Sequence, residues 1–447
     1  MGTPSVALLG DAHPDAPGGD HVPHVVAWNL TRRCNLECAH CYIAAGPSET
    51  AADELTTAEC LRIADEILAL NPAPMFILSG GEPLLRDDLE TLAAHASARG
   101  ATVVVGTNGT LLTDERIGTL QDAGVQGVAV SVESLRPEYH DRFRHGHGSL
   151  QATLDAVDRL GRHGLDFVIQ TTLTRGNRNE LGELVRWAAE REAVAFNAYF
   201  LVAAGRGARL TDLSPDEYES ALTELVDLHV EHLGRMMVRA KCAPQFMRLV
   251  HQRTPDSPIL NYRTRCPCGV QYCRVTPDGK LTACPYLPEP AGDLRTQPFE
   301  EVWRESPLFT ALRGGTLGGR CGRCEYRSLC GGCRARAFGE TGDFLAEDPS
   351  CTYQPDGVRE PIAAARPVTY GAAAAASMTW SREARARMER IPSFVRGVVM
   401  QRVEDYARRQ GHQEVTTELL AEVRSAMPVD FSKRLPFFLR QGTGNEY

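Results

Sequence analysis

The sequence predicts an α/β fold in which a parallel sheet covered by helices precedes a cysteine-rich unit and a small all-α unit. Three observations predict it. The chain has 447 residues, 43% of them hydrophobic, which is enough for several domains and a large core. Residues 24–202 alternate apolar stretches with helical ones. Twelve of the 14 cysteines fall into two groups, one early and one late in the chain.

Composition and charge exclude several classes of protein. The formal net charge is −9, from 57 acidic and 48 basic side chains, so a general basic surface for nucleic acid is absent. No apolar run approaches the length of a membrane span. Residues 1–23 lack a basic region before their short apolar patch, which predicts no export signal and a cytoplasmic protein. Without export, the many cysteines indicate metal or redox chemistry rather than disulfides.

Six strand–helix units are predicted in the first half of the chain. The expected strands, mostly apolar and rich in β-branched residues, are 24–30, 75–79, 101–107, 127–133, 166–174 and 194–202. The stretches with helical spacing are 56–70, 87–99, 113–123, 150–162 and 180–191. Fully apolar strands separated by helices are typical of a parallel sheet covered by helices. Ligands of such sheets bind at the carboxyl ends of the strands.

The rest of the chain divides by composition. We expect an N-terminal arm (1–23), a core (24–212) and a helical connector (213–261) with a helix from 215 to about 234. A cysteine-rich unit (262–356), a linker (357–378), a helical unit (379–427) and a tail (428–447) are expected to follow. The cysteine-rich unit has few periodic runs, which predicts a fold held by metal rather than by a large core. About three helices are expected in the last unit, with Thr416 as an N-cap.

Three cysteines stand in the loop after the first expected strand. Cys34, Cys38 and Cys41 are spaced as CxxxCxxC. A zinc site normally needs four protein ligands, whereas three thiolates on a four-iron cluster leave one iron open to a small chelating molecule. The alternative is a zinc site that borrows a distant fourth ligand.

This spacing resembles the signature of the radical S-adenosylmethionine (SAM) superfamily, with His40 at the aromatic position before the last cysteine. The resemblance implies a partial (β/α)6 TIM-like barrel. It also implies a [4Fe–4S] cluster held by the three cysteines. The reduced cluster would split bound SAM into methionine and a 5′-deoxyadenosyl radical, with an electron donor such as ferredoxin or flavodoxin.

Further strand ends resemble the same family. Gly80, Gly81 and Glu82 follow the second strand, and the resemblance implies that they hold the amino group of SAM. Asn108 and Ser131 end the third and fourth strands, where relatives contact the methionine carboxylate and the ribose. An Asn-Gly turn and a helix N-cap are the alternative interpretations of these two residues.

The charged stretch 140–149 is predicted to be a solvated loop. Relatives carry Gly where His145 stands, so a metal site formed by His145 and His147 is the alternative. Cys60, in a helical pattern, is predicted to be a small buried hydrophobic residue, and Cys242 receives no predicted role.

The late cysteines have the spacing CxxCx5CxxC, preceded and followed by single cysteines. They resemble the SPASM extension of radical SAM enzymes, which implies one or two auxiliary [4Fe–4S] clusters. The outer cluster would use Cys321, Cys324, Cys330 and Cys351. The inner one would use Cys284, Cys333 and two or three of Cys266, Cys268 and Cys273. Two zinc ribbons are the alternative, because CxxC pairs suit zinc equally well.

Three longer stretches, 200–207, 274–294 and 321–355, resemble radical SAM enzymes of haem biosynthesis. Those enzymes trim propionate or acetate side chains from iron tetrapyrroles, which implies decarboxylation or propionate removal here. Arg206, Arg334 and Arg336 are candidates to meet substrate carboxylates, with a structural role as the alternative. Residues 379–426 resemble the small helical domain of a light-independent protochlorophyllide reductase subunit. The matching residues are Trp380, Ile391, Pro392, Phe394, Val395, Arg396, Glu404, Tyr406, Ala407 and Thr416.

Two other functions are weighed. A SPASM peptide maturase would modify a ribosomally made peptide, but such enzymes usually carry a leader-binding domain, and only about 23 residues precede the first expected strand. An iron–sulfur electron carrier would need no SAM pocket, which the Gly-Gly-Glu run argues against.

Overall fold

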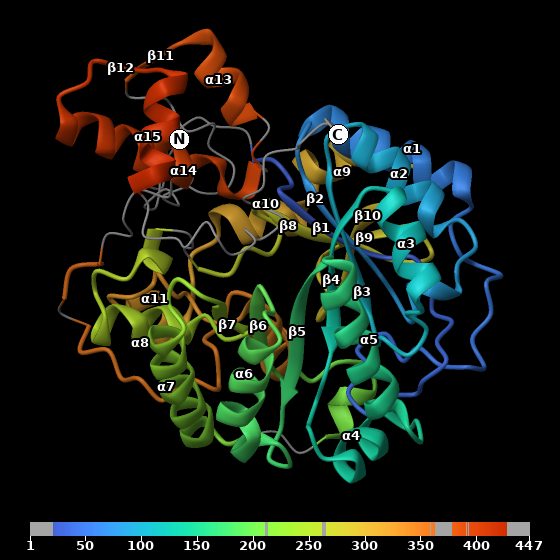
Figure 1. Cartoon of the computed structure of the whole chain (residues 1–447). Helices are drawn as coiled ribbons and strands as arrows, with labels where there is room; N and C mark the ends of the chain where they lie inside the picture. The colour runs from blue at the N-terminus through green and yellow to red at the C-terminus, as the bar shows by residue number, and fades with distance from the viewer. Residues whose placement is uncertain are drawn as a thin grey trace, which may run out of the picture.

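The computed structural model describes residues 21–210, 213–261, 265–357, 359–362, 378–389, 391 and 393–426. Its centre is one ten-stranded sheet in the order β10-β9-β8-β1-β2-β3-β4-β5-β6-β7, wrapped by helices (Figure 1). Strands β1 to β7 are all parallel. The predicted fold class, a parallel α/β sheet followed by a cysteine-rich part and a helical part, is therefore confirmed.

The six predicted strands all form. They are β1 (Val25–Asn29), β2 (Met75–Ser79), β3 (Thr102–Thr107), β4 (Val125–Ser131), β5 (Asp166–Leu173) and β6 (Ala195–Phe200). The helices between them are α1 (Thr57–Leu70), α2 (Leu89–Ala98), α3 (Asp114–Asp122), α4 (Pro137–Arg144), α5 (Ser149–His163) and α6 (Leu181–Glu190). Each crossover helix returns the chain to the same end of the sheet, so the loops after the strands gather at one edge.

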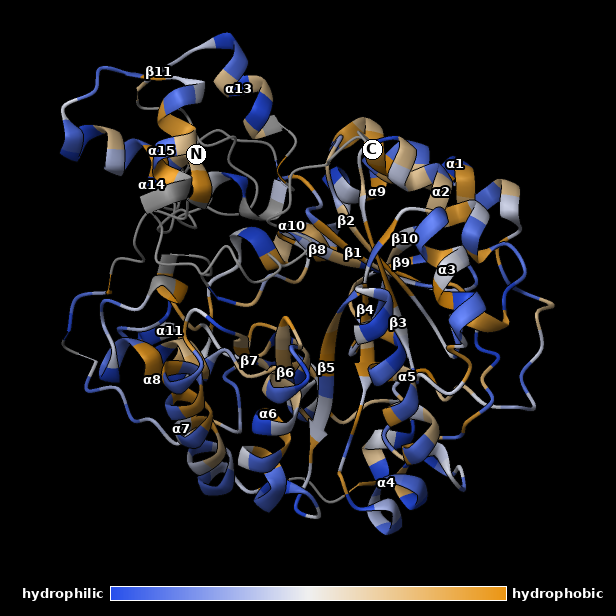
Figure 2. Ribbon diagram, viewed as in Figure 1, coloured by the Kyte–Doolittle hydropathy of each residue, from blue (hydrophilic) through white to orange (hydrophobic). Residues whose placement is uncertain are grey.

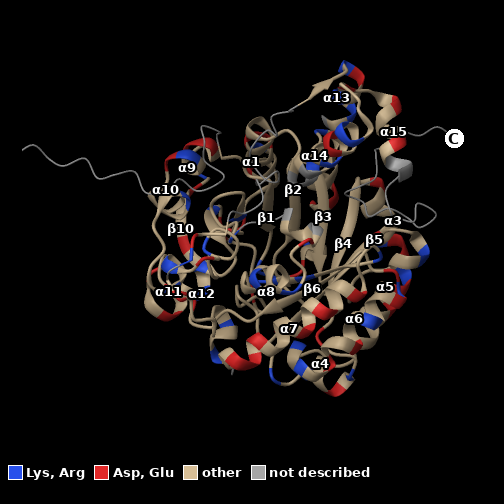
Figure 3. Ribbon diagram, turned by 90° about the vertical axis from the view of Figure 1, so that its left-hand side faces the viewer, with Lys and Arg blue, Asp and Glu red and all other residues tan. Residues whose placement is uncertain are grey.

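The main core lies between the sheet and its helices. Val103 and Val105 on β3 belong to it, whereas Val104 between them faces the concave side of the sheet. Figure 2 shows the strands mostly apolar and the helices two-faced. Figure 3 shows the charged residues along helices and loops, with strands β3 to β6 mostly free of them. This pattern is why the helices cover only one face of the sheet.

A seventh parallel strand was not predicted. The part of the connector after the predicted helix, expected to be poorly periodic, contains β7 (Met237–Lys241) and α8 (Gln245–Arg253). The helix itself forms as α7 (Pro215–Glu231), slightly shorter than the predicted 215 to about 234. Buried Val238 and Ala240 alternate with half-buried neighbours, so the strand has a period of two. The basic side chains of Arg239 and Lys241 made the alternation hard to recognise in the sequence. β7 pairs with β6 and brings Cys242, just after it, to the functional edge.

The cysteine-rich part joins the barrel rather than standing apart. β8 (Tyr272–Val275) pairs parallel with β1, and β9 (Lys280–Cys284) and β10 (Leu287–Asp293) continue the sheet antiparallel. Helices α9 (Phe299–Glu305), α10 (Pro307–Gly314), α11 (Gly319–Arg323) and α12 (Arg334–Thr341) follow. Phe299, Trp303 and Phe309 are fully buried in the main core. The prediction that this segment lacks a large core is therefore wrong.

The predicted solvated loop at 140–149 is also wrong in its first half. Residues 140–144 lie in α4, and both His140 and Arg144 are buried. The helix ends at His145, whose φ of 52° is left-handed, a conformation that explains the glycine expected there. His145 and His147 are exposed.

Three helices form the C-terminal unit, as predicted: α13 (Arg382–Glu389), α14 (Ser393–Gln410) and α15 (Thr417–Ala426). Two short strands, β11 (Thr379–Trp380) and β12 (Glu414–Val415), pair beside them. Thr416 caps α15 by accepting from the Leu419 N–H at 3.3 Å. The Trp380 indole donates to Glu404 inside a separate small core. Figure 1 shows this unit on the opposite side of the molecule from α4.

Some predictions fall outside the described residues: most of the arm 1–23, most of the linker 357–378, the tail 428–447, Pro392, and the side chains of Phe394 and Val395. Among the helices that are described, each is too short or too polar to cross a bilayer.

Candidate functional site

The early cysteines form one loop between β1 and α1. Cys34 and Cys38 are buried, and Cys41 is half-buried. Backbone N–H groups point at the sulfur atoms, from Leu36 to Cys34 at 3.4 Å and from Ala45 to Cys41 at 3.3 Å. Burial raises the pKa of the Cys34 thiol to about 12. A thiolate here therefore needs a cation or metal to stabilise it.

The two glycines after β2 lie against this loop. A Cβ on Gly80 would come within 2.6 Å of the Thr31 carbonyl oxygen, and one on Gly81 within 2.2 Å of the Arg33 carbonyl oxygen. The Gly81 N–H donates to the Thr31 carbonyl at 2.7 Å. The glycines thus allow the turn after β2 to approach the backbone that leads into Cys34.

Glu82 is fully buried beside the end of β3. Its carboxylate accepts from the Thr107 hydroxyl at 2.8 Å and from the Asn108 N–H at 2.9 Å. Burial raises the pKa of Glu82, and the two hydrogen bonds only partly offset that effect. The Asn108 amide donates to the Asn35 side chain at 2.8 Å and lies 3.9 Å from the Cys34 sulfur. Glu82 and Asn108 therefore meet at the cysteine loop, as their positions after neighbouring strands predict.

A buried charge cluster beside Cys38 was missed by the sequence analysis. The Arg144 guanidinium donates to the Glu133 carboxylate and lies 3.6 Å from the Cys38 sulfur. Burial opposes its charge, but Cys38 and Glu133 raise the Arg144 pKa above its ordinary value. Glu133 also accepts from the Thr172 N–H at 2.6 Å. A fixed cation next to a thiol is what a thiolate needs. Because α4 was predicted to be a solvated loop, no signal pointed to Arg144.

His40 packs against the same cluster. Its ring stacks on Phe143 at a centroid distance of 4.8 Å and an angle of 13°, and its Nε2 lies 3.7 Å from the Glu133 carboxylate. Burial lowers its pKa well below the ordinary value, and Arg144 adds to that effect. The Ala39 N–H donates to the Phe143 carbonyl at 2.8 Å, which fixes the loop to α4. Ser131 ends β4 on the same edge and is half-buried.

Arg206 holds the cysteine loop from a second side. It donates to the carbonyls of Cys38 at 2.8 Å and Ala45 at 2.7 Å. Gly205, with φ of 52°, lies so close that a Cβ would meet the Cys41 carbonyl at 2.5 Å. Of its two predicted roles, the structure gives Arg206 the structural one.

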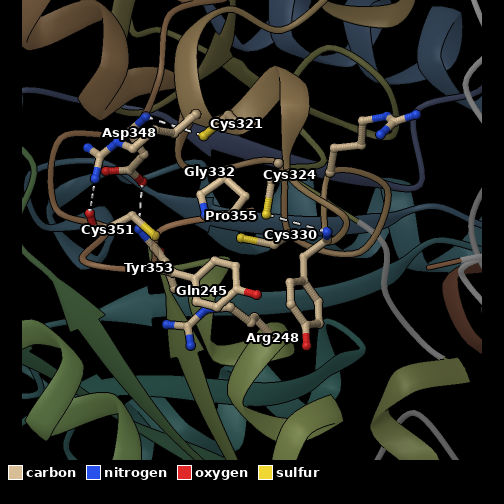
Figure 4. A pocket seen from close by; sticks show the side chains of 14 residues that line it. Gln245, Arg248, Cys321, Cys324, Cys330, Gly332, Asp348, Cys351, Tyr353 and Pro355 are labelled. Carbon is tan, nitrogen blue, oxygen red and sulfur yellow. Dashed lines mark hydrogen bonds between the residues drawn. The ribbon is translucent and has the colours of Figure 1, made fainter. Parts of the chain in front are cut away.

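Four late cysteines surround one pocket, shown in Figure 4. Cys321, Cys324, Cys330 and Cys351 line it, together with Tyr326, Asp348 and Tyr353. The Asp348 N–H points at the Cys321 sulfur at 3.5 Å, and the Tyr326 N–H at the Cys324 sulfur at 3.4 Å. These four are the cysteines that the resemblance assigns to the outer cluster.

A second thiol group lies between this pocket and the early loop. Cys266 and Cys268 have sulfur atoms 3.3 Å apart. Cys333 lies within electrostatic range of Cys266 and Cys284, and Cys284 lies within range of Cys268. Cys273 does not join them. It is fully buried, and Arg313 is the charged group that acts on its thiol among the residues that the structure describes. Cys60 is buried in the main core, as predicted.

The two other candidate arginines also have structural partners. Arg334 donates to the carbonyls of Phe344 and Ala346, both at 2.8 Å. Arg336 is buried and pairs with Asp348 at 3.2 Å. Both arginines are buried, so these contacts favour the structural role over contact with a substrate carboxylate.

Four half-buried tyrosines lie between the early thiols and the inner group. The rings of Tyr42 and Tyr286 are 5.3 Å apart, and Tyr42 directly follows Cys41. Burial raises the pKa of Tyr286, and its neighbours Cys242, Tyr199, Tyr42 and Tyr272 raise it further. The Tyr42 hydroxyl accepts from Asn29 at 2.8 Å. This tyrosine group, Tyr42, Tyr199, Tyr272 and Tyr286, forms an aromatic wall at the edge of the barrel.

The donor sets suit iron–sulfur clusters. All three groups offer buried thiols, several with N–H groups directed at sulfur, the usual surroundings of such clusters. In the described residues, no three His, Cys, Asp or Glu side chains converge as a single ion requires, and this includes His145 and His147. A four-iron cluster distributes its thiolates over the corners of a cube and does not need that convergence.

Family models match three parts of the chain. The radical SAM superfamily model matches residues 28–188, the model of an iron–sulfur cluster-binding domain matches 266–334, and that of the protochlorophyllide reductase 57 kD subunit matches 380–424. The AdoMet-dependent heme synthase of Methanosarcina barkeri is 39% identical, over 75% of this chain and 98% of that protein. The mycofactocin maturase of Mycolicibacterium smegmatis is 30% identical, over 74% of this chain and 83% of the maturase.

Solved structures share the fold. Streptococcus suis SuiB, bound to its precursor peptide SuiA, superposes with a TM-score of 0.62 at 15% identity, covering 75% of this chain and 77% of SuiB.

Proposed function

The chain belongs to the radical SAM superfamily, and from this membership we propose that it removes propionate carboxyl groups from an iron tetrapyrrole in haem biosynthesis. One observation carries the proposal: the 39% identity to a heme synthase extends over 98% of that enzyme. The match therefore includes the segments that meet substrate as well as the shared cofactor machinery. Radical SAM proteins use a [4Fe–4S] cluster and SAM, and their cluster-binding domains hold auxiliary clusters.

We assign the ligands by the three thiol groups. Cys34, Cys38 and Cys41 would hold the cluster that binds SAM. Cys321, Cys324, Cys330 and Cys351 would hold the outer auxiliary cluster, and Cys266, Cys268, Cys284 and Cys333 surround the inner one. The support is burial, the N–H groups directed at sulfur, and the four-thiol pocket of Figure 4. Cys273 is left out, since no other thiol of the described chain acts on it.

When bound, the first cluster and SAM supply a carbon-centred radical that abstracts hydrogen from an unreactive carbon. The chain's own residues prepare that site. Arg144 places positive charge beside Cys38, and Glu133 balances it. We propose that SAM binds next to the three thiols. The residues that border this place are Gly80, Gly81, Glu82, Asn108, Ser131 and His40. The buried walls exclude bulk water from this place.

The tyrosine group offers a surface for the substrate. A tetrapyrrole is a broad, flat, mostly apolar ring, and half-buried aromatic side chains are typical of the pockets that take such ligands. The group lies between the first and the inner thiols. A macrocycle placed there would lie near the three early thiols and near the inner thiol group, whose cluster would supply an electron acceptor for the decarboxylation.

The test is turnover by reconstituted, reduced protein without oxygen. Iron-coproporphyrin III should stimulate formation of 5′-deoxyadenosine and be converted with release of carbon dioxide, followed by mass spectrometry. Didecarboxysirohaem tests the neighbouring tetrapyrrole branch. SAM cleavage that responds to neither compound, but to a peptide, would support the maturase alternative instead.

Matched variants separate the site from the fold. Cys34→Ala with Cys38→Ala and Cys41→Ala should abolish SAM cleavage and lose the iron of one cluster. Cys60→Ala, a buried cysteine in a helix, should keep both. Ferredoxin and flavodoxin are the donors to compare with a chemical reductant.

A further inference from the structure

Cys242 is a fifth thiol beside the inner group, and the family assignment gives it no role. It follows β7 at the functional edge of the barrel. The thiols of Cys333, Cys284 and Cys266 lie within its electrostatic range. Tyr286 is a further neighbour. The thiol therefore faces the same space as the inner group, although it comes from a strand of the barrel.

Its backbone is held in an unusual conformation. Cys242 has a φ of 58°, in the left-handed region that residues with a Cβ rarely occupy. Its carbonyl accepts from the Arg336 guanidinium at 2.9 Å. A conformation of this kind persists where the surroundings fix it. Here the fixing group is a side chain of the cluster-binding segment itself.

Arg336 ties Cys242 to Cys333. The guanidinium pairs with the fully buried Asp348 carboxylate at 3.2 Å, and that carboxylate accepts from the Cys333 N–H at 2.7 Å. One buried ion pair thus sets the backbone positions of two thiols that are far apart in sequence. The Asp348 carboxylate also accepts from the side-chain amide of Gln245 at 2.9 Å, and Gln245 lies three residues after Cys242.

The remaining thiols of the inner group come from three places. Cys284 ends β9, Cys333 precedes α12, and Cys266 and Cys268 share one turn with sulfur atoms 3.3 Å apart. A cubic cluster has four iron corners, held apart by the cube. Three segments supply three corners, and the thiol pair on one short turn is poorly placed to span two.

We propose that Cys242 is a protein ligand of the inner auxiliary cluster, with Cys284, Cys333 and one thiol of the Cys266–Cys268 pair. The inference rests on the proposed presence of that cluster. It makes the cluster a link between the barrel and the cluster-binding segment, since one ligand comes from the barrel and three from the segment.

The test measures the cluster and not turnover. In a background of Cys34→Ala, Cys38→Ala and Cys41→Ala, iron and sulfide are counted after anaerobic reconstitution, and electron paramagnetic resonance is recorded in oxidised and reduced protein. Cys242→Gly removes the thiol and suits a positive φ, so it should fold well. We expect loss of about four iron atoms per chain, one cluster's worth, or conversion to a three-iron signal.

Two comparisons complete the design. Cys273→Ala should keep the parent's iron content and signals. Of Cys266→Ala and Cys268→Ala, one should keep an inner cluster. The inference is overturned if Cys242→Gly keeps the parent's iron and signals. Absence of any auxiliary cluster from the parent would instead refute the proposed function's cofactor assignment.

Discussion

At the scale of single residues, the buried pair of Arg144 and Glu133 is the feature that most distinguishes this site. Each side chain is almost fully buried, and the guanidinium faces both a carboxylate and the Cys38 thiol. Burying such charges costs free energy unless they remain paired. The pair is therefore expected to be sensitive to the loss of either partner.

Arg144→Met should strand the Glu133 charge and lower the free energy of unfolding by about 3–5 kcal/mol. Iron incorporation at the early cysteines should fall with it, because the cation beside Cys38 is gone. Urea unfolding and iron analysis measure the two effects. The double variant Arg144→Met with Glu133→Gln should recover part of the stability but not the iron. Equal stability of single and double variants would contradict the pairing.

Gly81 gives a second prediction at this scale. Gly81→Ala would place a Cβ 2.2 Å from the Arg33 carbonyl, so the turn must move away from the cysteine loop. We expect a loss of about 1–3 kcal/mol, the usual cost of overpacking, and a reduced iron content. The control is Gly118→Ala in α3, where an added Cβ meets nothing within 4 Å. That change should stabilise the helix by roughly 0.5–1 kcal/mol. If both variants behave alike, the close approach does not matter.

Residue types and local spacing predicted the thiol groups, but not the charges around them. Cys34, Cys38 and Cys41 are neighbours in sequence, so their spacing carries the signal. Arg144 reaches Cys38 across 106 positions. Arg336 reaches Cys242 across 94 positions. Such contacts depend on the path of the chain through the sheet, which no local pattern contains.

At the scale of elements, the strands of the parallel sheet were the easiest to predict, because short runs dominated by apolar and β-branched residues leave few alternatives. β7 was missed because basic residues stand at two of its five positions. α4 was missed because its buried residues are His140, Phe143 and Arg144, two of which count as polar in any hydropathy pattern. Tertiary partners, not propensity, decide both elements.

The end of α4 gives a prediction. His145 adopts a left-handed φ of 52°, which costs a residue with a Cβ roughly 1–2 kcal/mol. His145→Gly should therefore raise the thermal unfolding midpoint. His147→Gly serves as the control, since His147 is not among the residues with positive φ and should lose stability on gaining a glycine. A stabilised His147→Gly and an unchanged His145→Gly would show that the cap conformation carries no strain.

At the scale of the whole molecule, the C-terminal helical unit closes the end of the barrel opposite the thiols. Ile391 packs with Met75, Val104 and Met237, which lie on the concave side of three strands. Next to it, the Ser393 hydroxyl donates to the Ala73 carbonyl at 2.7 Å. The unit thus contacts β2 near its start, whereas the functional loops follow the strand ends.

Ile391→Asp should detach this unit, since a carboxylate cannot be buried among three apolar side chains without a partner. We expect faster hydrogen exchange in α14 and along the starts of β2 and β7, measured by mass spectrometry. Iron content should stay at the parent's level, because the thiols lie at the opposite end. Arg385→Asp, an exposed change in α13, is the control for added charge. Unchanged exchange at β2 would mean that Ile391 does not seal the barrel.

The same contact is expected to respond to acid. His24, just before β1, lies 2.7 Å from the Ser393 hydroxyl through its Nδ1. Burial lowers its pKa from 6.5 to about 3, and Arg396 of the helical unit adds to that effect. When the helical unit leaves, His24 becomes exposed and its pKa returns toward 6.5, so the undocked state binds a proton more readily than the docked state. Docking of the helical unit is therefore fully stable above about pH 6.5 and weakens as the pH falls toward 3. Hydrogen exchange of α14, corrected for the intrinsic rate, should therefore quicken between pH 7 and pH 5. His24→Asn should flatten this dependence, and a variant that retains it would assign the effect to other groups.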